Sequence, residues 1–395
     1  MDVDASRGLL RYLAQVPDPR ARNISHRLYN LLVISLLAVL CRCEDYVEIA
    51  DWAQANEPWL ATFLDLAHGT PSHDTFDRVF ARLDPMALER CFLAFTQAVQ
   101  ESSEGRLLAV DGKSIRRSFE AGGRKAAVHM ISAWDHHNGL ILGQLACEDG
   151  GKKSNEITAI PRLLKLLDIR GCIVSIDAIG CQKQIAEQVI DQGGDYLLAV
   201  KDNQPTLHEN LKLYFDEAIE HAFEGVEHVH AQSVDGDHGR LETRRVWATH
   251  QVDWLTRQLA GDPWPQLRGI VCVERQRHVF GTDKTTVERH YRITSVDPRD
   301  VGGDWLLEAV RKHWGIENSV HWSLDVTYRE DHSRVRKDHG PENISRLRRM
   351  SLNMVKRLPD RLSPHTGRPR KTSLKRRRLW CDWDRDYLLA ALTTV

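Results

Sequence analysis

This sequence has no stretch that is long and apolar enough to span a membrane. Its most apolar run is Leu31–Cys41, which falls far short of the roughly 20 residues that a membrane-spanning helix needs, so we interpret it as a buried core helix. Met1 is followed by Asp2, Val3 and Asp4, where a secretory signal would place basic residues and an apolar core. The sequence therefore predicts a cytoplasmic protein with no membrane partner.

The cysteines lack the spacing of a metal site. Among the eight there is no CxxC pair and no zinc-finger pattern, and Cys41 and Cys43 are too close together for an ordinary metal-binding pair. Reduced, mostly buried thiols in a cytosolic protein fit this pattern best.

The chain also lacks the excess of basic residues that a uniformly basic nucleic-acid binder would carry, because its net charge is −1. The average hides an asymmetry. Arg329–Trp380 holds 17 basic and 5 acidic residues, whereas the rest of the chain holds 37 basic and 50 acidic ones. This split points to a polyanionic partner near the C-terminal end, with a solvated basic tail as the alternative.

Helical and strand-like patterns occupy different parts of the chain. The first 104 residues have helical periodicity, for example in Leu31–Leu40 and Pro85–Val99. The region that follows alternates short apolar runs with amphipathic stretches. Its predicted strands are Leu107–Val110, Ala126–Trp134, Leu140–Cys147, Cys172–Ile176 and Tyr196–Val200, with a helix starting near Pro161 and another between the last two strands.

Three strands in an antiparallel meander, followed by helix, strand, helix and strand, is the element order of the RNase H-like fold, an α/β fold with a mixed five-stranded sheet. Its first and fourth strands lie side by side at the centre of the sheet. Asp111 follows the first predicted strand and Asp177 follows the fourth, so the two carboxylates should be neighbours. Either residue alone would more simply be an acidic residue in a loop.

The rest of the chain contains an interruption and then a helix. Strand-like stretches at Leu241–Thr249, Gly269–Arg277 and Thr285–Thr294 indicate a mostly β insertion. A long helix is then predicted from about Trp305 to Leu324, with Glu317 in its second half.

Several motifs, taken together and in this order, are specific. They are AVDGKSIR at Ala109, KSNEITAIP at Lys153, SIDAIGCQ at Ser175, GGDYLLAVKDNQ at Gly193, HGRLETR at His238, HWGIENSVHWSLDVTYRED at His313 and ENISRLRRMSLN at Glu342. With them the chain resembles insertion-sequence transposases of the DDE superfamily, in the H-repeat-associated (ISAs-one type) branch, over roughly residues 20 to 390.

The resemblance implies a metal-dependent DNA strand-transfer enzyme. Asp111 matches the first catalytic Asp, Asp177 the second, and Glu317 the Glu of the HWGIEN motif. The expected partners are the DNA of the element's terminal inverted repeats and the target DNA, with a homodimer in the DNA complex. Many members of the wider group have Tyr and Arg before the Glu and Lys after it. This chain has Val310, His313 and Leu324 at those spacings, which puts those DNA contacts in doubt.

The regions predicted on this basis are five. They are an N-terminal helical domain associated with DNA binding (1–104), the first part of the RNase H-like core (105–204), the mostly β insertion (205–297), the last part of the core with the Glu317 helix (298–356), and a basic C-terminal segment (357–395).

Three acids suit the chemistry of this class. Hydrolysis of a phosphodiester and its transfer to a new 3′-hydroxyl are both displacements at phosphorus, which two metal ions about 3.5–4 Å apart can promote. Mg²⁺ prefers oxygen ligands, so we expect two Mg²⁺ ions, with Mn²⁺ as a substitute, held by Asp111, Asp177 and Glu317. Asp325, Glu330 and Asp331 are rival acids beyond the helix, in a segment read as strand or loop. A zinc site of His313, Glu317 and His321 is a weaker alternative.

Basic residues near these acids are candidates for contacts with DNA phosphates, which give affinity without sequence information. Lys113 and Arg116 could meet the DNA backbone or balance local acids, and His313 and His321 could contact phosphate or pack internally. The remaining candidates are Arg346, Arg348, Arg349, Arg376, Arg377 and Arg378. We interpret Trp134, Trp314 and Trp322 as core residues in preference to platforms on which bases stack.

Two other functions stay open at this point. One is an RNase H-like nuclease that cleaves without joining, since its active site would look the same. The other is a catalytically inactive DNA-binding relative of a transposase, although the presence of all three acids argues against it.

Overall fold

The structure is a computed structural model that describes residues 8–22, 24–99, 105–119, 126–147, 156–237, 239–258, 262–282, 284–362, 367–368 and 371–393. Two predicted motifs extend past these limits, because Lys153–Asn155 and His238 lie outside the described residues. None of the described helices is both long and apolar enough to cross a membrane, and all eight cysteines are free thiols.

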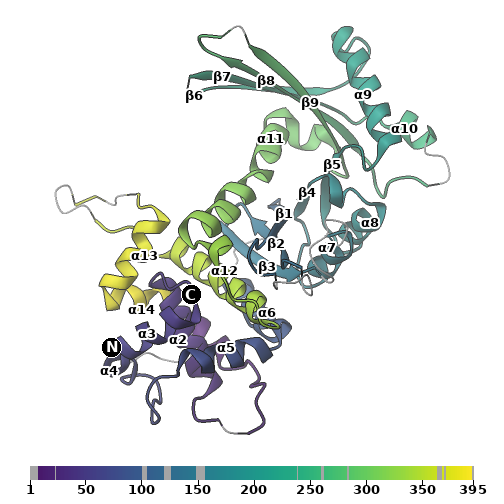
Figure 1. The fold of residues 1–395 in the computed structure, drawn as a ribbon. Coiled ribbons are helices and arrows are strands. Elements are labelled where there is room, and N and C mark those ends of the chain that lie inside the picture. The colour runs from purple at the N-terminus through teal and green to yellow at the C-terminus, as the bar shows by residue number, and fades with distance from the viewer. Residues whose placement is uncertain are drawn as a thin grey trace.

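One mixed sheet organises the molecule (Figure 1). Its strands follow the order β3-β2-β1-β4-β5-β9-β8-β7-β6. They are β1 (Leu107–Ser114), β2 (His129–Asp135), β3 (Leu140–Ala146), β4 (Ile173–Ile176), β5 (Asp195–Val200), β6 (Val229–Asp237), β7 (Arg240–Thr249), β8 (Gly269–Val279) and β9 (Thr285–Thr294). β4 runs parallel to both β1 and β5, and the other pairs are antiparallel.

The sheet has nine strands where five were expected. The predicted insertion strands are confirmed as β7, β8 and β9, and β6 is an additional strand. Because β9 pairs with β5, from Leu197 with Thr294 to Val200 with Tyr291, the insertion extends the same sheet. Figure 1 shows these strands projecting from the other five as a long ribbon.

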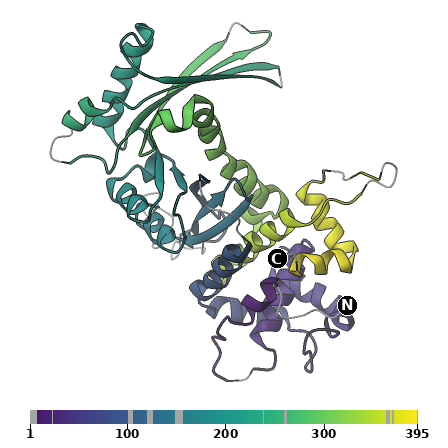
Figure 2. The same ribbon diagram turned by 180° about the vertical axis from the view of Figure 1, so that it is seen from behind.

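Helices cover the sheet on both sides. In both views α7 (Glu156–Lys165) and α8 (Lys183–Asp191) lie on one side of the first five strands, with α11 (Pro298–His313) and α12 (Gly340–Arg357) on the other (Figures 1 and 2). Along the ribbon, α9 (Pro205–Glu220) contacts β9 and α11 contacts β6 and β7. The helix predicted near Pro161 begins earlier, so Pro161 lies inside α7 and Glu156 in its first turn.

A short helix, α10 (Asp253–Gln258), lies beside α9 in Figure 1, and the remaining α-helices gather at the other end of the molecule. They are α1 (Gly8–Leu13), α2 (Leu28–Leu40), α3 (Tyr46–Ala55), α4 (Glu57–Leu60), α5 (His73–Arg82), α6 (Pro85–Val99), α13 (Leu374–Trp383) and α14 (Arg385–Thr393). Contacts of α13 with α2 and of α14 with α1 join the two ends of the chain. Figure 2 shows the C-terminal helices beside the N-terminal ones. α2 is buried on nearly every face, which explains its unbroken apolar sequence.

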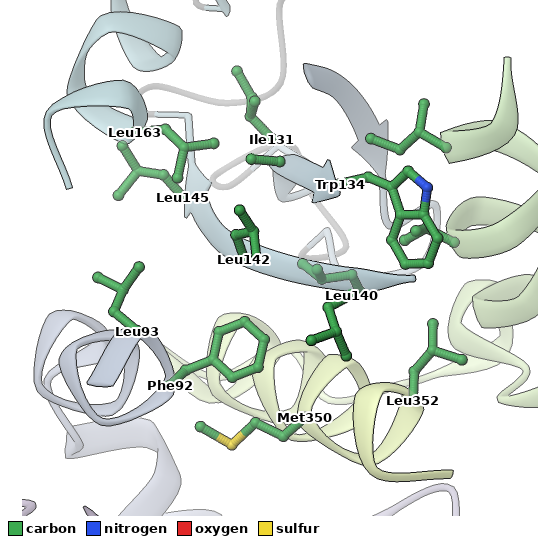
Figure 3. Close-up of a cluster of buried hydrophobic side chains, with 14 of the residues drawn as sticks. Phe92, Leu93, Ile131, Trp134, Leu140, Leu142, Leu145, Leu163, Met350 and Leu352 are labelled. Carbon is green, nitrogen blue, oxygen red and sulfur yellow. The ribbon is translucent and has the colours of Figure 1, made fainter. Parts of the chain in front are cut away.

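α12 connects this helical end to the sheet. Figure 3 shows Phe92 of α6 and Met350 of α12 near Leu140 and Leu142 of β3, and all four side chains are buried. The amide of Asn353 adds two hydrogen bonds to the backbone of Ile141, at 2.9 and 2.8 Å. Because α12 is packed from both sides, it fixes the helical end relative to β1–β3.

Candidate active site

The pairing of β1 with β4 makes Asp111 and Asp177 neighbours. The two strands are parallel, and Val110 pairs with Ile176, so the residues that follow them lie side by side. Asp111 is inside β1, which runs on to Ser114, whereas the sequence analysis placed it at the strand's end. Asp177 directly follows β4, as predicted. It caps a short 3₁₀ turn by accepting a hydrogen bond from the Ile179 N–H at 3.2 Å.

Asp111 is largely buried and has other acids nearby. Burial raises its pKa to about 7, and the charges of Asp177, Glu156 and Glu317 act in the same direction. A hydrogen bond from the Gly112 N–H to Oδ1, at 2.8 Å, opposes the shift. A site in which three other carboxylates act on one Asp favours a bound cation over a free acid.

Glu317 lies where the chain leaves regular helix. The long helix predicted to reach Leu324 stops being α-helical at His313, and π-helical turns follow at Glu317–His321 and Ser323–Thr327. Such wide turns occur often at functional sites. Glu317 is exposed, as a ligand for an incoming metal and DNA must be.

Two tryptophans interpreted as core residues are exposed instead. Trp314 is 58% exposed and Trp322 is 56% exposed, on either side of Glu317, whereas Trp134 is buried as expected. The apolar stripe of this segment consists of Ile316 and Val320, which are buried. The two indole rings therefore face solvent on the same segment as the proposed catalytic acid.

The two histidines near Glu317 are neutral and buried, so their surroundings favour internal packing, one of the two expected roles, over contact with phosphate. Burial lowers the pKa of each to about 3, with further lowering by Arg292 at His313 and by Arg349 at His321. His313 Nδ1 lies 3.1 Å from Ser175 Oγ. His321 Nδ1 lies 3.6 Å from an Asp111 oxygen. Both imidazoles are packed inside the protein, His313 beside Ser175 and His321 beside Asp111.

Sequence reasoning missed a buried pair behind Asp111. Glu156 accepts a 2.6 Å hydrogen bond from His129 Nε2, and His129 Nδ1 lies 2.7 Å from Ser114 Oγ. A methyl group on Gly112 would come within 2.4 Å of the imidazole and 2.7 Å of the carboxylate. This close approach explains the glycine after Asp111, and the signal in the sequence was the Glu of the KSNEITAIP motif.

Lys113 is buried among three acids, which favours the alternative that it balances their charge. Its side chain is 7% exposed, and Nζ lies 2.7 Å from Asp325, 3.3 Å from Glu330 and 3.3 Å from Asp331. These were the rival acids, and they lie on π- and 3₁₀-helical turns, not on a strand or loop. Arg116 remains exposed, with Nε 3.2 Å from Asp331, so it stays a candidate for contact with DNA.

Three arginines of α12 are buried, and not on the surface where contact with phosphate was expected. Arg346, Arg348 and Arg349 are each at most 1% exposed. Arg346 Nε lies 3.1 Å from Glu89, Arg349 Nη1 lies 2.9 Å from Glu330, and Arg348 donates to a backbone carbonyl at 2.8 Å. Their guanidinium groups are held between α12 and its neighbours by these ion pairs and hydrogen bonds.

The arginine cluster at Arg376–Arg378 divides in the same way. Arg378 is 3% exposed, donates to the Val39 carbonyl at 2.7 Å and stacks over Tyr328. Arg377 donates to the Lys356 carbonyl at 2.8 Å and pairs with Asp360 at 2.8 Å. Arg376 is exposed. Of this cluster, Arg376 is the residue whose side chain is available to DNA.

The oxygen donors at this site fit Mg²⁺ or Mn²⁺. Nevertheless, no group of three or more His, Cys, Asp or Glu side chains in the described ranges is already arranged to hold a metal ion. This applies to the three predicted acids and to the alternative zinc set of His313, Glu317 and His321. Asp111 and Asp177 follow paired positions on neighbouring strands, and the three carboxylates would have to close around a cation.

Comparisons with known proteins agree on one family. A family model described as "Transposase DDE domain" matches residues 102–354, and a model described as "DDE_Tnp_1-associated" matches residues 10–96. The chain is 38% identical to "Putative transposase YncI" of Escherichia coli O157:H7, covering 89% of this chain and 88% of that protein. It is 31% identical to "H repeat-associated putative transposase YhhI" of E. coli K12, covering 97% of each.

Among solved structures, the chain resembles one in the cryo-EM structure of the piggyBac transposase synaptic complex with hairpin DNA. The TM-score is 0.40 at 11% identity, over 97% of this chain and 78% of the other.

Proposed function

Since this chain belongs to the family of transposases with a DDE domain, we propose that it cleaves DNA at the ends of an insertion sequence and joins the freed 3′ ends to a target. The observation that carries the proposal is the placement of Asp111 beside Asp177 by strand pairing, together with the action of the Glu317 charge on Asp111. The proposed catalytic unit is an RNase H-like core formed by β1–β5.

Asp111, Asp177 and Glu317 would hold the divalent cations. When bound, these ions supply Lewis acidity to the attacking and leaving oxygens. The chain's own contribution is to orient two of the carboxylates: the N–H of Gly112 donates to Asp111, and the N–H of Ile179 donates to Asp177. The buried His321 lies 3.6 Å from an Asp111 oxygen.

DNA is the proposed partner, and a homodimer in the DNA complex stays a prediction. Arg116 and Arg376 are exposed cations that could contact phosphates. The direct test is to incubate the protein with Mg²⁺ and a duplex carrying the inverted repeats that flank its coding region. Joined products support a transposase, cleavage without joining supports the nuclease alternative, and binding without either supports an inactive relative.

Cation binding should depend on pH. In the metal-free protein the pKa of Asp111 is about 7, so protons compete with the cation below that pH. We expect the affinity for Mn²⁺, measured by electron paramagnetic resonance, to fall by roughly tenfold for each pH unit below 7 and to level off above it. Asp168→Asn, which alters an exposed acid paired with Arg170, should leave this profile unchanged; a flat profile between pH 5.5 and 8 would contradict the assignment.

The same shift predicts a change in stability. Because the folded pKa of Asp111 lies above its ordinary value of 3.8, the charged carboxylate disfavours folding. The cost is absent below about pH 4 and complete above about pH 7. Asp111→Asn should therefore raise the free energy of unfolding of the metal-free protein at pH 8 and leave it unchanged at pH 4. Urea denaturation at the two pH values measures this, and a loss of stability at pH 8 would speak against it.

The two kinds of arginine in the C-terminal cluster should behave differently. The slope of log K for DNA binding against log salt concentration is negative. Replacing exposed Arg376 with Ala should reduce the magnitude of this slope by about one unit, since one phosphate contact is lost. Replacing buried Arg378 with Ala should lower stability, because the guanidinium donates to two backbone carbonyls, and leave the slope of the folded protein unchanged. An unchanged slope for Arg376→Ala would remove this segment from the DNA contact.

A further inference from the structure

A buried arginine near the site has donors that nothing in the described chain accepts. Arg292 on β9 is 5% exposed, and its Nε and Nη1 atoms are buried without a hydrogen-bond partner among the described residues. Buried polar groups are nearly always paired, because an unpaired one loses its bonds to water without replacement. A guanidinium left in this state can still donate to a partner that arrives later.

The sheet register places this arginine in line with the catalytic acids. Ile176 pairs with Leu198 on β5. The residues that follow them, Asp177 and Ala199, therefore lie side by side, and Ala199 pairs with Arg292 on β9. Neighbouring strands are about 4.8 Å apart, so Arg292 starts roughly 10 Å from Asp177 on the same face. The single methyl of Ala199 leaves room for the arginine side chain to reach across.

Electrostatic effects agree with this placement. Burial lowers the pKa of Arg292 to about 10. The negative charge of Asp177 acts in the opposite direction and raises this pKa. The positive charge of Arg292 in turn lowers the pKa of His313. The guanidinium is therefore close enough to interact electrostatically with both Asp177 and His313.

We propose that Arg292 is a catalytic residue that binds the scissile phosphodiester, donating its unpaired N–H groups to a non-bridging phosphate oxygen. This inference rests on the proposed function. The planar guanidinium fork matches two phosphate oxygens and is weakly hydrated for a cation, so it suits a site that must exclude water. Beside Asp177 it would hold the phosphate next to the cation that the carboxylates bind, while its charge offsets their repulsion toward DNA.

The competing explanation is that Arg292 only neutralises Asp177. A neutral methylphosphonate at the cleavage position separates the two, because it removes the charge that Arg292 would bind and leaves Asp177 intact. The probes are two duplexes of the element end, identical except for a phosphate or a methylphosphonate at that position. Binding is measured without divalent cations for the wild type and for Arg292→Gln.

The wild type should bind the natural duplex roughly 10- to 100-fold more tightly than the methylphosphonate duplex, as expected for a charged hydrogen bond. Arg292→Gln should bind both at the weaker level. Arg292→Lys keeps the positive charge but lacks the planar guanidinium group, so it should retain part of the preference for the natural duplex. This variant replaces Arg292→Gln in the test if the Gln variant does not fold. Full preference in both variants would overturn the proposal.

A matched control is Arg106→Gln, which alters another buried arginine, next to the start of β1 and paired with Asp135 at 2.9 Å. It should lose stability and keep the full preference for the natural phosphate. If the wild type cleaves the natural duplex in Mg²⁺ and the Arg292 variants do so equally well, this inference fails alone. If the wild type never cleaves an element end, the proposed function fails.

Discussion

Asp177→Asn should abolish strand cleavage and joining while DNA binding stays close to that of the wild type. Asn keeps the size of the side chain and one carbonyl oxygen, but it loses the charge that would hold a divalent cation. Removal of one important electrostatic contact costs on the order of 100- to 1,000-fold in rate, and loss of a metal ion should cost more. Binding should survive because phosphate contacts come mainly from lysine and arginine.

The measurements are the rate of product formation in Mg²⁺ and the dissociation constant for the same duplex. Asp168→Asn is the control, because Asp168 is exposed, paired with Arg170 and remote from the site's strand ends. It should keep full activity. Cleavage by Asp177→Asn at a rate near that of the wild type would remove Asp177 from the catalytic set.

Glu330→Gln should destabilise the fold by about 3–5 kcal/mol, which is typical of breaking a buried ion pair. Glu330 is completely buried, 2.9 Å from Arg349 and 3.3 Å from Lys113. The variant leaves Arg349 without its carboxylate partner and removes one of the three acids around Lys113, and it loosens the connection between β1, the π-helical segment and α12. Urea denaturation at pH 7 measures the loss.

The loss should also shrink in acid. Burial works against ionisation of Glu330, but Arg349 and Lys113 outweigh it and lower its pKa from 4.5 to about 2. A depressed pKa gives stability that is complete above about pH 4.5 and disappears as the pH falls through 2. Glu288→Gln is the control, because Glu288 is half exposed in a surface pair with Arg275 and should cost less than about 1 kcal/mol. Equal losses in the two variants would contradict the buried network.

The position of Asp111 beside Asp177 was predictable because it depends on local patterns. Each follows a short apolar run that reads as a buried strand, and the order of elements between them fixes which strands are neighbours. The extension of the sheet to nine strands was not predictable in the same way. It depends on the pairing of β9 with β5, between residues nearly 100 positions apart, such as Leu197 and Thr294.

The arginines of α12 show why charge patterns mislead. A helix rich in arginine reads as a DNA-binding surface unless its partners are known, and those partners are distant in sequence. Arg346 pairs with Glu89, which is 257 residues away. The same holds for Arg292, whose place beside Asp177 follows from strand register and not from its neighbours in the chain. The site residues that sequence alone missed are therefore those defined by packing between remote elements.

One measurement tests the central claim most directly: the anomalous scattering of Mn²⁺ in a crystal of the protein bound to a duplex of the element end. The proposal predicts Mn²⁺ coordinated by carboxylate oxygens of Asp111, Asp177 and Glu317, with the scissile phosphate beside it. Mn²⁺ bound elsewhere, or bound by the acids around Lys113 with the three proposed carboxylates still apart, would contradict it.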